Sequence, residues 1–361
     1  MRFLLFTFLA LVLPIAAPLH AEDWRTKAKE QTYILEDFSF GVGAAMDVRV
    51  HVTTLGTPRR NAAGEIDNAI MVLHGTGGSG HQFFRPQFAD MLFGPGQPFD
   101  ISKHYVILPD NIGHGKSSKP SDGLRMQFPR YDYADMVAAQ HRLLTEKLGV
   151  NRLQLILGTS MGCMHAFVWG TTQPGFAERL APFACNAMEI AGRNRMWREM
   201  SIAAIMDDPL WNGGNYTSPP EQGLRTARYL SIIAGANASA LQAEYPTRKA
   251  ALAYFQETDA TRAKAQLDAN DQIYQLDSSW NYNPAPLLSR IKVPVLWVNS
   301  ADDFINPPEL GTAEAQAREM PRARFILLPA TPETKGHGTH TWAKFWRDDL
   351  AKLLAEPVSA P

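Results

Sequence analysis

Residues 153–164, LQLILGTSMGCM, decide the fold, because an apolar run ends there in a serine set among small residues. The run LQLIL is typical of a buried strand, and Gly158, Ser160 and Gly162 then complete the pattern G-x-S-x-G. This pattern is typical of a nucleophile elbow, a sharp strand-to-helix turn that exposes one hydroxyl. The next segment, MGCMHAFVWGTTQ, is expected to form the helix after the turn. Ser160 is therefore the candidate nucleophile.

Eight apolar runs that favour β structure divide the chain, and they occupy residues 33–40, 46–52, 69–75, 105–109, 153–158, 180–185, 293–299 and 324–329. The first two alternate in polarity like a hairpin with one solvent-exposed face, whereas the rest are nearly continuous, as parallel strands covered on both faces are. Helical patterns, including those over residues 131–148 and 340–354, separate most of the later strands. We therefore predict an α/β protein with a mostly parallel sheet covered by helices on both faces.

The beginning of the chain has the layout of a cleaved signal peptide. Arg2 precedes an apolar stretch, and a small-residue segment ends at Ala21. A retained anchor is less favoured, because the unbroken apolar run 3–13 is too short to span a bilayer. We expect a secreted or periplasmic protein without a stable membrane anchor. The predicted segments are a signal peptide (1–21), the first part of the core (22–186), a helical lid inserted after the sixth strand (187–286) and the second part of the core (287–361).

Charge and cysteine content exclude several classes of partner. The chain has 35 basic and 36 acidic residues, a net charge of −1 and no basic run, so we expect no nucleic-acid partner. Its two cysteines, Cys163 and Cys185, are too few to make a disulfide framework or a zinc cluster of thiolates. Both lie in apolar surroundings, so we expect two buried free thiols, although an oxidising compartment would allow them to pair.

A serine nucleophile needs a histidine to take its proton and an acid to orient that histidine. In strand–turn–helix folds with this motif, the acid and then the histidine follow later strands. The acid is expected after residues 293–299, where SADDFINPPE offers Asp302 and Asp303. We favour Asp303, because it stands four residues before the loop proline, Pro307.

The histidine is expected after residues 324–329, where ATPETKGHGTHTW offers two candidates. His337 lies between glycines in a loop and is free to reach the serine, so we favour it. His340 is expected in the first turn of the last helix, with a structural role. No third ligand accompanies this pair, so we predict neither a metal site nor a cofactor.

Two glycine-rich loops complete the candidate site. In LHGTGGSG (73–80) the amide of Thr76, together with that of Met161, is expected to bind the oxyanion that develops when serine attacks a carbonyl. The chain has no G-x-x-x-x-G-K-[ST] motif, which argues against a phosphate cradle. Three polar residues are expected to hold turns in place by hydrogen bonds rather than to catalyse. They are His74, two residues before Thr76, and Asp110 and His114 in PDNIGHGKSSKP (109–120).

With these residues in place, the chain resembles the α/β-hydrolase superfamily and, within it, the homoserine O-acetyltransferase family. The closer resemblance runs from about Met126 to Pro294 and rests on FPRYDYADMVAAQHRLLTEKLGV, GTSMGCMHAFVW, DDPLWNGGNYTSPPEQGLRTAR and LDANDQIYQLDSSWNYNP. It implies a triad of Ser160, Asp303 and His337 and a lid that often mediates homodimer formation. It also implies a lid arginine for the substrate carboxylate, which falls on Arg228, with Arg225 nearby.

The chain departs from this family where the acceptor is recognised. The family's acetyltransferases carry an acid directly after the catalytic histidine, whereas Gly338 stands here. The loops HGTGG and NIGHG resemble those of ordinary hydrolases, and an exported protein would lack acetyl-CoA. The sequence therefore favours an exported serine hydrolase that cleaves a small-molecule carboxylic ester through an acyl-enzyme. A homoserine O-acetyltransferase-like enzyme is the alternative, and a non-catalytic binding protein is a second alternative that the filled triad positions oppose.

Overall fold

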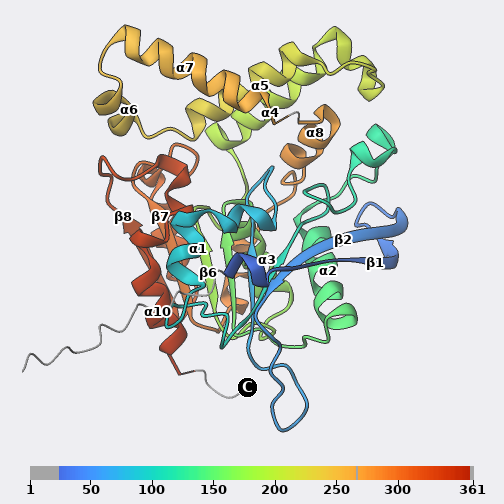
Figure 1. The fold of residues 1–361 in the computed structure, drawn as a ribbon, viewed down its shortest axis with the longest axis vertical. Helices are drawn as coiled ribbons and strands as arrows, with labels where there is room; N and C mark the ends of the chain where they lie inside the picture. Colours follow the sequence, from blue (N-terminus) through green and yellow to red (C-terminus); the bar gives the residue numbers. More distant parts are fainter. Residues whose placement is uncertain (1–23, 266, 358–361) are drawn as a thin grey trace, which may run out of the picture.

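The computed structural model describes residues 24–265 and 267–357 of the 361-residue chain (Figure 1). The predicted signal peptide, residues 1–21, lies outside the described residues. Within the described ranges, no helix combines the length and the apolar composition needed to cross a membrane.

One eight-stranded sheet forms the centre of the molecule, in the order β1-β2-β4-β3-β5-β6-β7-β8. β1 pairs antiparallel with β2, and β2 pairs antiparallel with β4, whereas all remaining neighbours are parallel. The strands are β1 (Lys29–Ser39), β2 (Ala45–Leu55), β3 (Ala69–Leu73), β4 (Tyr105–Pro109), β5 (Leu155–Thr159), β6 (Leu180–Phe183), β7 (Val295–Ser300) and β8 (Ala323–Leu328). The predicted α/β fold class is confirmed, and each predicted run contains or overlaps one strand.

Helices cover both faces of the sheet because side chains alternate between the faces along each strand. In β5, Leu155 and Leu157 join the apolar cluster beneath two helices, α1 and α10, whereas Ile156 joins the cluster on the opposite face. The helices of the core are α1 (Pro86–Leu92), α2 (Tyr133–Arg142), α3 (Met161–Thr172), α9 (Thr312–Ala317) and α10 (Arg347–Ala355). Fully buried apolar side chains on both faces explain why the central strands read as continuous apolar runs.

The last helix begins later than predicted. Residues 340–346 were expected to be helical, but the chain forms 3₁₀ turns over Gly336–Thr341 and Ala343–Phe345, and α10 starts only at Arg347. Trp346 departs from helical geometry, with φ near −142°, and its buried ring packs against Phe183. Burial of this large aromatic side chain therefore outweighs local helix propensity.

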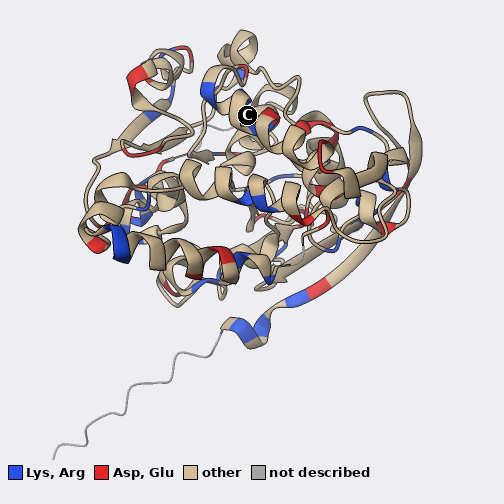
Figure 2. Ribbon diagram, turned by 90° about the horizontal axis from the view of Figure 1, so that it is seen from above, with Lys and Arg blue, Asp and Glu red and all other residues tan. Residues whose placement is uncertain are grey.

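A helical lid lies between β6 and β7 and forms the upper part of the molecule in Figure 1. It contains α4 (Gly192–Met206), α5 (Glu221–Ala234), α6 (Ala238–Glu244), α7 (Arg248–Ala263) and α8 (Ala269–Asp277). A small apolar cluster of its own includes Ile205, Leu224 and Ile273. Basic and acidic residues are interspersed along the described ribbon in Figure 2 rather than gathered in one tract.

Candidate active site

Ser160 occupies a strained turn between β5 and α3. Its φ and ψ are 56° and −111°, a conformation that non-glycine residues rarely adopt, and its amide donates to the Phe183 carbonyl at 2.8 Å. The neighbouring glycines allow this turn. A Cβ atom on Gly158 would lie 1.9 Å from the Gly162 oxygen, and one on Gly162 would lie 2.2 Å from the Leu73 oxygen. The small residues around Ser160 are therefore required by close backbone contacts.

The structure brings Ser160, His337 and Asp303 together from three different strand ends. Ser160 Oγ lies 2.8 Å from His337 Nε2, and His337 Nδ1 lies 2.8 Å from Asp303 Oδ2. A carboxylate only accepts hydrogen bonds, so Nδ1 donates to it and Nε2 remains free to accept the serine proton. The geometry is that of a hydroxyl next to a general base whose tautomer is fixed by an acid.

Asp303 is fully buried, yet it remains an anion. Burial alone would raise the pKa of its carboxyl group, but the adjacent His337 and hydrogen bonds from Asn306 outweigh this effect and hold the pKa below its usual value. Oδ1 accepts from the amides of Ile305 and Asn306 at 2.8 and 3.1 Å, and the Asn306 side chain donates to Oδ2 at 3.0 Å. Asn306 is a functional residue that no sequence motif identifies, and its position three residues after Asp303 is the only signal for it.

Asp302, the other acid considered, holds the loop that carries His337. Its Oδ2 accepts from Thr334 Oγ1 at 2.7 Å and from the Gly336 amide at 2.9 Å. The two adjacent carboxylates thus have different contacts, since only Asp303 contacts the imidazole of His337.

His340, the other histidine considered, packs against His337 with ring centroids 5.1 Å apart. It lies in the 3₁₀ turn Gly336–Thr341, not in the first turn of the last helix as predicted. Burial lowers its pKa to about 3, so this imidazole is neutral at ordinary pH. Its position fits the expected structural role.

The loop after β3 lies against the serine. A Cβ atom on Gly75 would lie 3.3 Å from Ser160 Cβ, which places the next residue, Thr76, at the edge of the site. Met161 is the first residue of α3, and its amide has no partner within the helix. Neither the Thr76 nor the Met161 amide donates a backbone hydrogen bond among the described residues. Both are therefore open donors beside Ser160.

The polar residues expected to pin turns are engaged in structural contacts. Asp110 accepts from the amides of Gly80 and Lys116, both at 2.8 Å, so it ties two loops together. His74 accepts from the Asn111 amide at 3.1 Å. The ring of His114 packs against the ring of His74, with ring centroids 5.1 Å apart.

Arg228 lies within the lid, and its charged neighbours are two lid carboxylates. Its guanidinium is 3.8 Å from Glu221 and 3.8 Å from Asp259 of α7, and its side chain is 12% exposed. Arg225 binds the same Asp259 at 2.9 Å. Both Arg228 distances are too long for hydrogen bonds, and Arg228 Nε is buried without a hydrogen-bond partner among the described residues.

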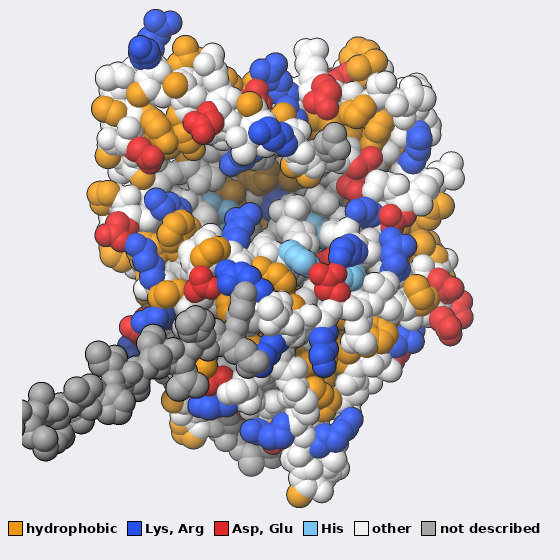
Figure 3. Space-filling view, viewed as in Figure 1, with side chains coloured by type: hydrophobic (Ala, Val, Ile, Leu, Met, Phe, Trp, Pro, Cys, Tyr) orange, Lys and Arg blue, Asp and Glu red, His pale blue; other side chains and the backbone are white. Residues whose placement is uncertain are grey.

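The lid also contacts the loop of His337. Asn237 Nδ2 donates to the Thr334 carbonyl at 2.7 Å and to the Thr331 carbonyl at 3.1 Å. A Cβ atom on Gly336 would lie 2.7 Å from the Ala236 oxygen, so the backbones of lid and loop are in close contact. Figure 3 shows the surface hollowed between the lid and the core.

The expectation of two free thiols was wrong, because Cys163 and Cys185 form a disulfide with Cα atoms 5.9 Å apart. Cys163 lies in the first turn of α3, and Cys185 lies just after β6. β5 and β6 are parallel neighbours, so the residues that follow them meet at one edge of the sheet. Ala184, with φ near 64°, bends the chain directly before Cys185. Sequence separation alone does not reveal this proximity.

Comparisons with known proteins agree with this architecture. The model of the alpha/beta hydrolase fold family matches residues 68–333. A homoserine O-acetyltransferase of Solidesulfovibrio magneticus is 32% identical over 262 residues, which cover 66% of this chain and 62% of that protein. The chain thus spans less than two thirds of that relative.

Solved structures show the same fold. A homoserine O-acetyltransferase from Bacillus anthracis superposes with a TM-score of 0.81 at 22% identity, over 92% of this chain and 99% of that one. A structure described as esterase E22 superposes with a TM-score of 0.78, also at 22% identity, over 91% of this chain and 100% of that one. At this identity the likeness supports the fold alone. One of the two structures is named as an acetyltransferase and the other as an esterase.

Proposed function

Because the chain belongs to the alpha/beta hydrolase fold family, and within it resembles the homoserine O-acetyltransferases, we propose that it transfers acyl groups through an acyl-enzyme on Ser160. The observation that carries this proposal is the hydrogen-bonded chain from Ser160 through His337 to Asp303, with both contacts at 2.8 Å. A hydroxyl, a base and a buried acid in this order are the elements of serine acyl-transfer chemistry.

In the first half-reaction Ser160 Oγ attacks the carbonyl carbon of an ester or thioester, while His337 Nε2 takes its proton. The oxyanion of the tetrahedral intermediate faces the amides of Thr76 and Met161. His337 then returns the proton to the leaving alcohol or thiol as the bond to it breaks. Asp303 holds the imidazole in the right tautomer and stabilises its charged form.

In the second half-reaction an acceptor attacks the acyl-enzyme, and His337 repeats its role as base and acid. Curated relatives are named as homoserine acyltransferases, which supports an alcohol such as homoserine as the acceptor. The names of these relatives therefore favour the acyltransferase alternative over the hydrolase hypothesis that the sequence favoured. We therefore give transfer to an alcohol as the leading reaction.

Hydrolysis is the second candidate, and two observations favour it. Gly338 supplies no acid for the amino group of an amino-acid acceptor. The loops HGTGG and NIGHG resemble those of ordinary hydrolases. Water would then be the acceptor.

Product analysis distinguishes the two reactions. Protein that begins after residue 21 is incubated with 4-nitrophenyl acetate, with or without homoserine, and the products are identified by mass spectrometry. Acetyl-homoserine in the first sample supports transfer, whereas free acetate alone in both samples supports hydrolysis. Ser160→Ala is expected to abolish both products, with a loss on the order of a million-fold. Undiminished turnover in this variant would refute the acyl-enzyme.

We also propose export, on the basis of the N-terminal pattern. The Cys163–Cys185 disulfide supports it, because disulfides persist mainly in oxidising compartments. An exported enzyme would meet no acetyl-CoA, which would favour water as the acceptor. Cell fractionation, with thiol alkylation before and after reduction, tests this proposal. Recovery in the cytoplasm with two alkylated thiols would contradict it.

A further inference from the structure

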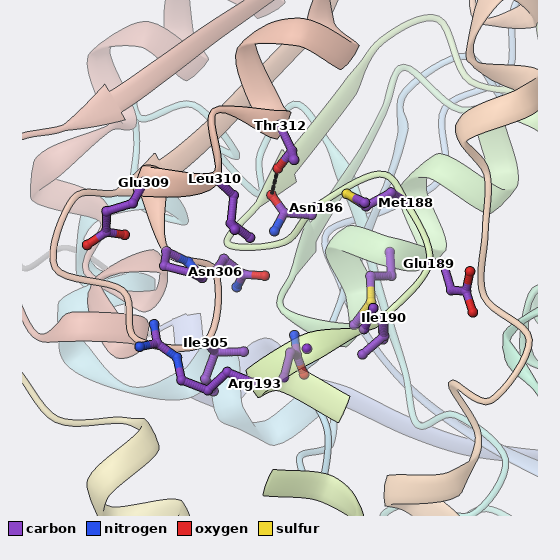
Figure 4. Close-up of a pocket in the computed structure, with 15 residues that line it drawn as sticks. Asn186, Met188, Glu189, Ile190, Arg193, Ile305, Asn306, Glu309, Leu310 and Thr312 are labelled. Atoms are coloured by element: carbon purple, nitrogen blue, oxygen red, sulfur yellow. Dashed lines mark hydrogen bonds between the residues drawn. The ribbon is translucent and has the colours of Figure 1, made fainter. Parts of the chain in front are cut away.

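A cavity of about 500 Å³ lies between the loops after β6 and β7 and the first turn of α4 (Figure 4). This volume lies within the usual range of small-molecule sites. Its lining is mainly apolar and includes Met164, Met188, Ile190, Ile305 and Leu310. Two methionines give such a wall the adaptability to fit chains of different shape.

The charged residues of this cavity do not suit an amino-acid ligand. In Figure 4, Glu189 and Glu309 lie at opposite edges, with their carboxylates turned outward. Arg193 is engaged by Phe304, since its Nη2 donates to the Phe304 carbonyl at 2.7 Å and its guanidinium lies 3.8 Å from the ring centroid. An uncharged apolar group is therefore the ligand that this interior favours.

Two residues that line the cavity are hydrogen bonded to residues of the triad. The Met164 amide donates to the Ser160 carbonyl at 3.2 Å, and Asn306, which also lines the cavity, donates to Asp303 at 3.0 Å. In the sheet, β6 and β7 lie between β5, which precedes Ser160, and β8, which precedes His337.

The position of the open amides limits where the substrate lies relative to Ser160. The Thr76 loop follows β3, which is the neighbour of β5 on the side away from β6. A carbonyl oxygen that points to Thr76 therefore leaves the β6 side of Ser160 for the rest of the substrate, which comprises the acyl chain and the leaving group that His337 protonates.

We propose that this cavity is the acyl pocket, and that the acyl group is an uncharged apolar chain longer than acetyl. The proposal rests on the acyl-enzyme at Ser160, but not on whether water or an alcohol accepts the acyl group. Acetyl would leave most of the cavity unfilled, whereas a longer chain would bury its methylene groups against Met188 and Ile190.

The test measures release of 4-nitrophenol from acetyl, butanoyl, hexanoyl and octanoyl esters. In the unmodified chain, kcat/KM is expected to rise on the order of ten-fold or more from acetyl to hexanoyl, because each buried methylene favours binding. Met188→Trp fills the cavity and is expected to abolish this rise while sparing the acetyl ester. Met188→Ala enlarges the cavity and is expected to move the optimum toward longer chains. Met206→Trp, on an exposed part of α4 outside the cavity lining, is the control for adding an indole.

Two outcomes would overturn the proposal: a preference for acetyl in the unmodified chain, or an equal loss on all esters in Met188→Trp. Labelling of Ser160 by a fluorophosphonate separates this failure from failure of the proposed function. A labelled enzyme without chain-length preference refutes the acyl pocket alone. A protein that is neither labelled nor active refutes the acyl-enzyme and the pocket with it.

Discussion

Asp302 and Asp303 are adjacent and chemically identical, yet their contacts assign them different roles. Asp303 fixes the tautomer of His337, so Asp303→Asn is expected to lower kcat on the order of ten-thousand-fold, because the amide can hold the wrong tautomer. Asp302→Asn keeps an oxygen for the Gly336 amide and is expected to retain most activity. Steady-state kinetics on one aryl ester tests both variants, with circular dichroism to show that they fold. A larger loss in Asp302→Asn would reverse the assignment.

Sequence reasoning was effective for residues whose role follows from chain order. The motif around Ser160 and the order acid then histidine are one-dimensional features, and the structure brings those residues together. The disulfide between Cys163 and Cys185 was missed because it depends on which strands are neighbours and on the bend at Ala184. The contacts of Arg228 with Asp259 depend on how two lid helices pack, which spacing does not reveal.

Among the elements, the loop that carries His337 is held from two sides. Asp302 binds it from the core, and Asn237, the N-cap of α6, binds it from the lid. We expect Asn237→Ala to lower kcat on the order of ten-fold with little change in KM, because small displacements of a catalytic group are costly.

A general loss of folded protein would also lower the apparent kcat without changing KM, so kcat must be expressed per active site. Active-site titration with a fluorophosphonate counts the active sites. Ser239→Ala, an exposed change in α6, is the matched control. Unchanged kcat per labelled site in Asn237→Ala would show that the lid does not position His337.

Element boundaries were predicted less well than element types. The sheet strands were recognised because burial on both faces makes them continuously apolar. The start of α10 was placed too early, because the burial of Trp346 interrupts a segment whose local pattern is helical. Tertiary packing decides such boundaries, and the periodicity of the sequence carries no information about that packing.

At the scale of the whole molecule, histidines whose pKa is lowered by burial make the fold sensitive to acid. Burial lowers the pKa of His74 and His165 and lowers the pKa of His114 and of His340 to about 3. In the unfolded chain these groups return to about 6.5. Between the two values the unfolded state binds more protons, so the free energy of unfolding falls as the pH is lowered from about 6.5 toward 3.

His114→Asn tests this prediction, since the amide can replace the hydrogen bond from His114 Nδ1 to the Ile112 carbonyl but takes up no proton. Urea unfolding at a series of pH values is expected to show a slope that is shallower by up to about 1.4 kcal/mol per pH unit below pH 6.5. Tyr131→Phe is the control, because burial raises the pKa of that phenol and it stays protonated throughout. It is expected to change the absolute free energy of unfolding without changing the slope. Equal slopes for His114→Asn and the unmodified chain would show that His114 is not buried as a neutral group.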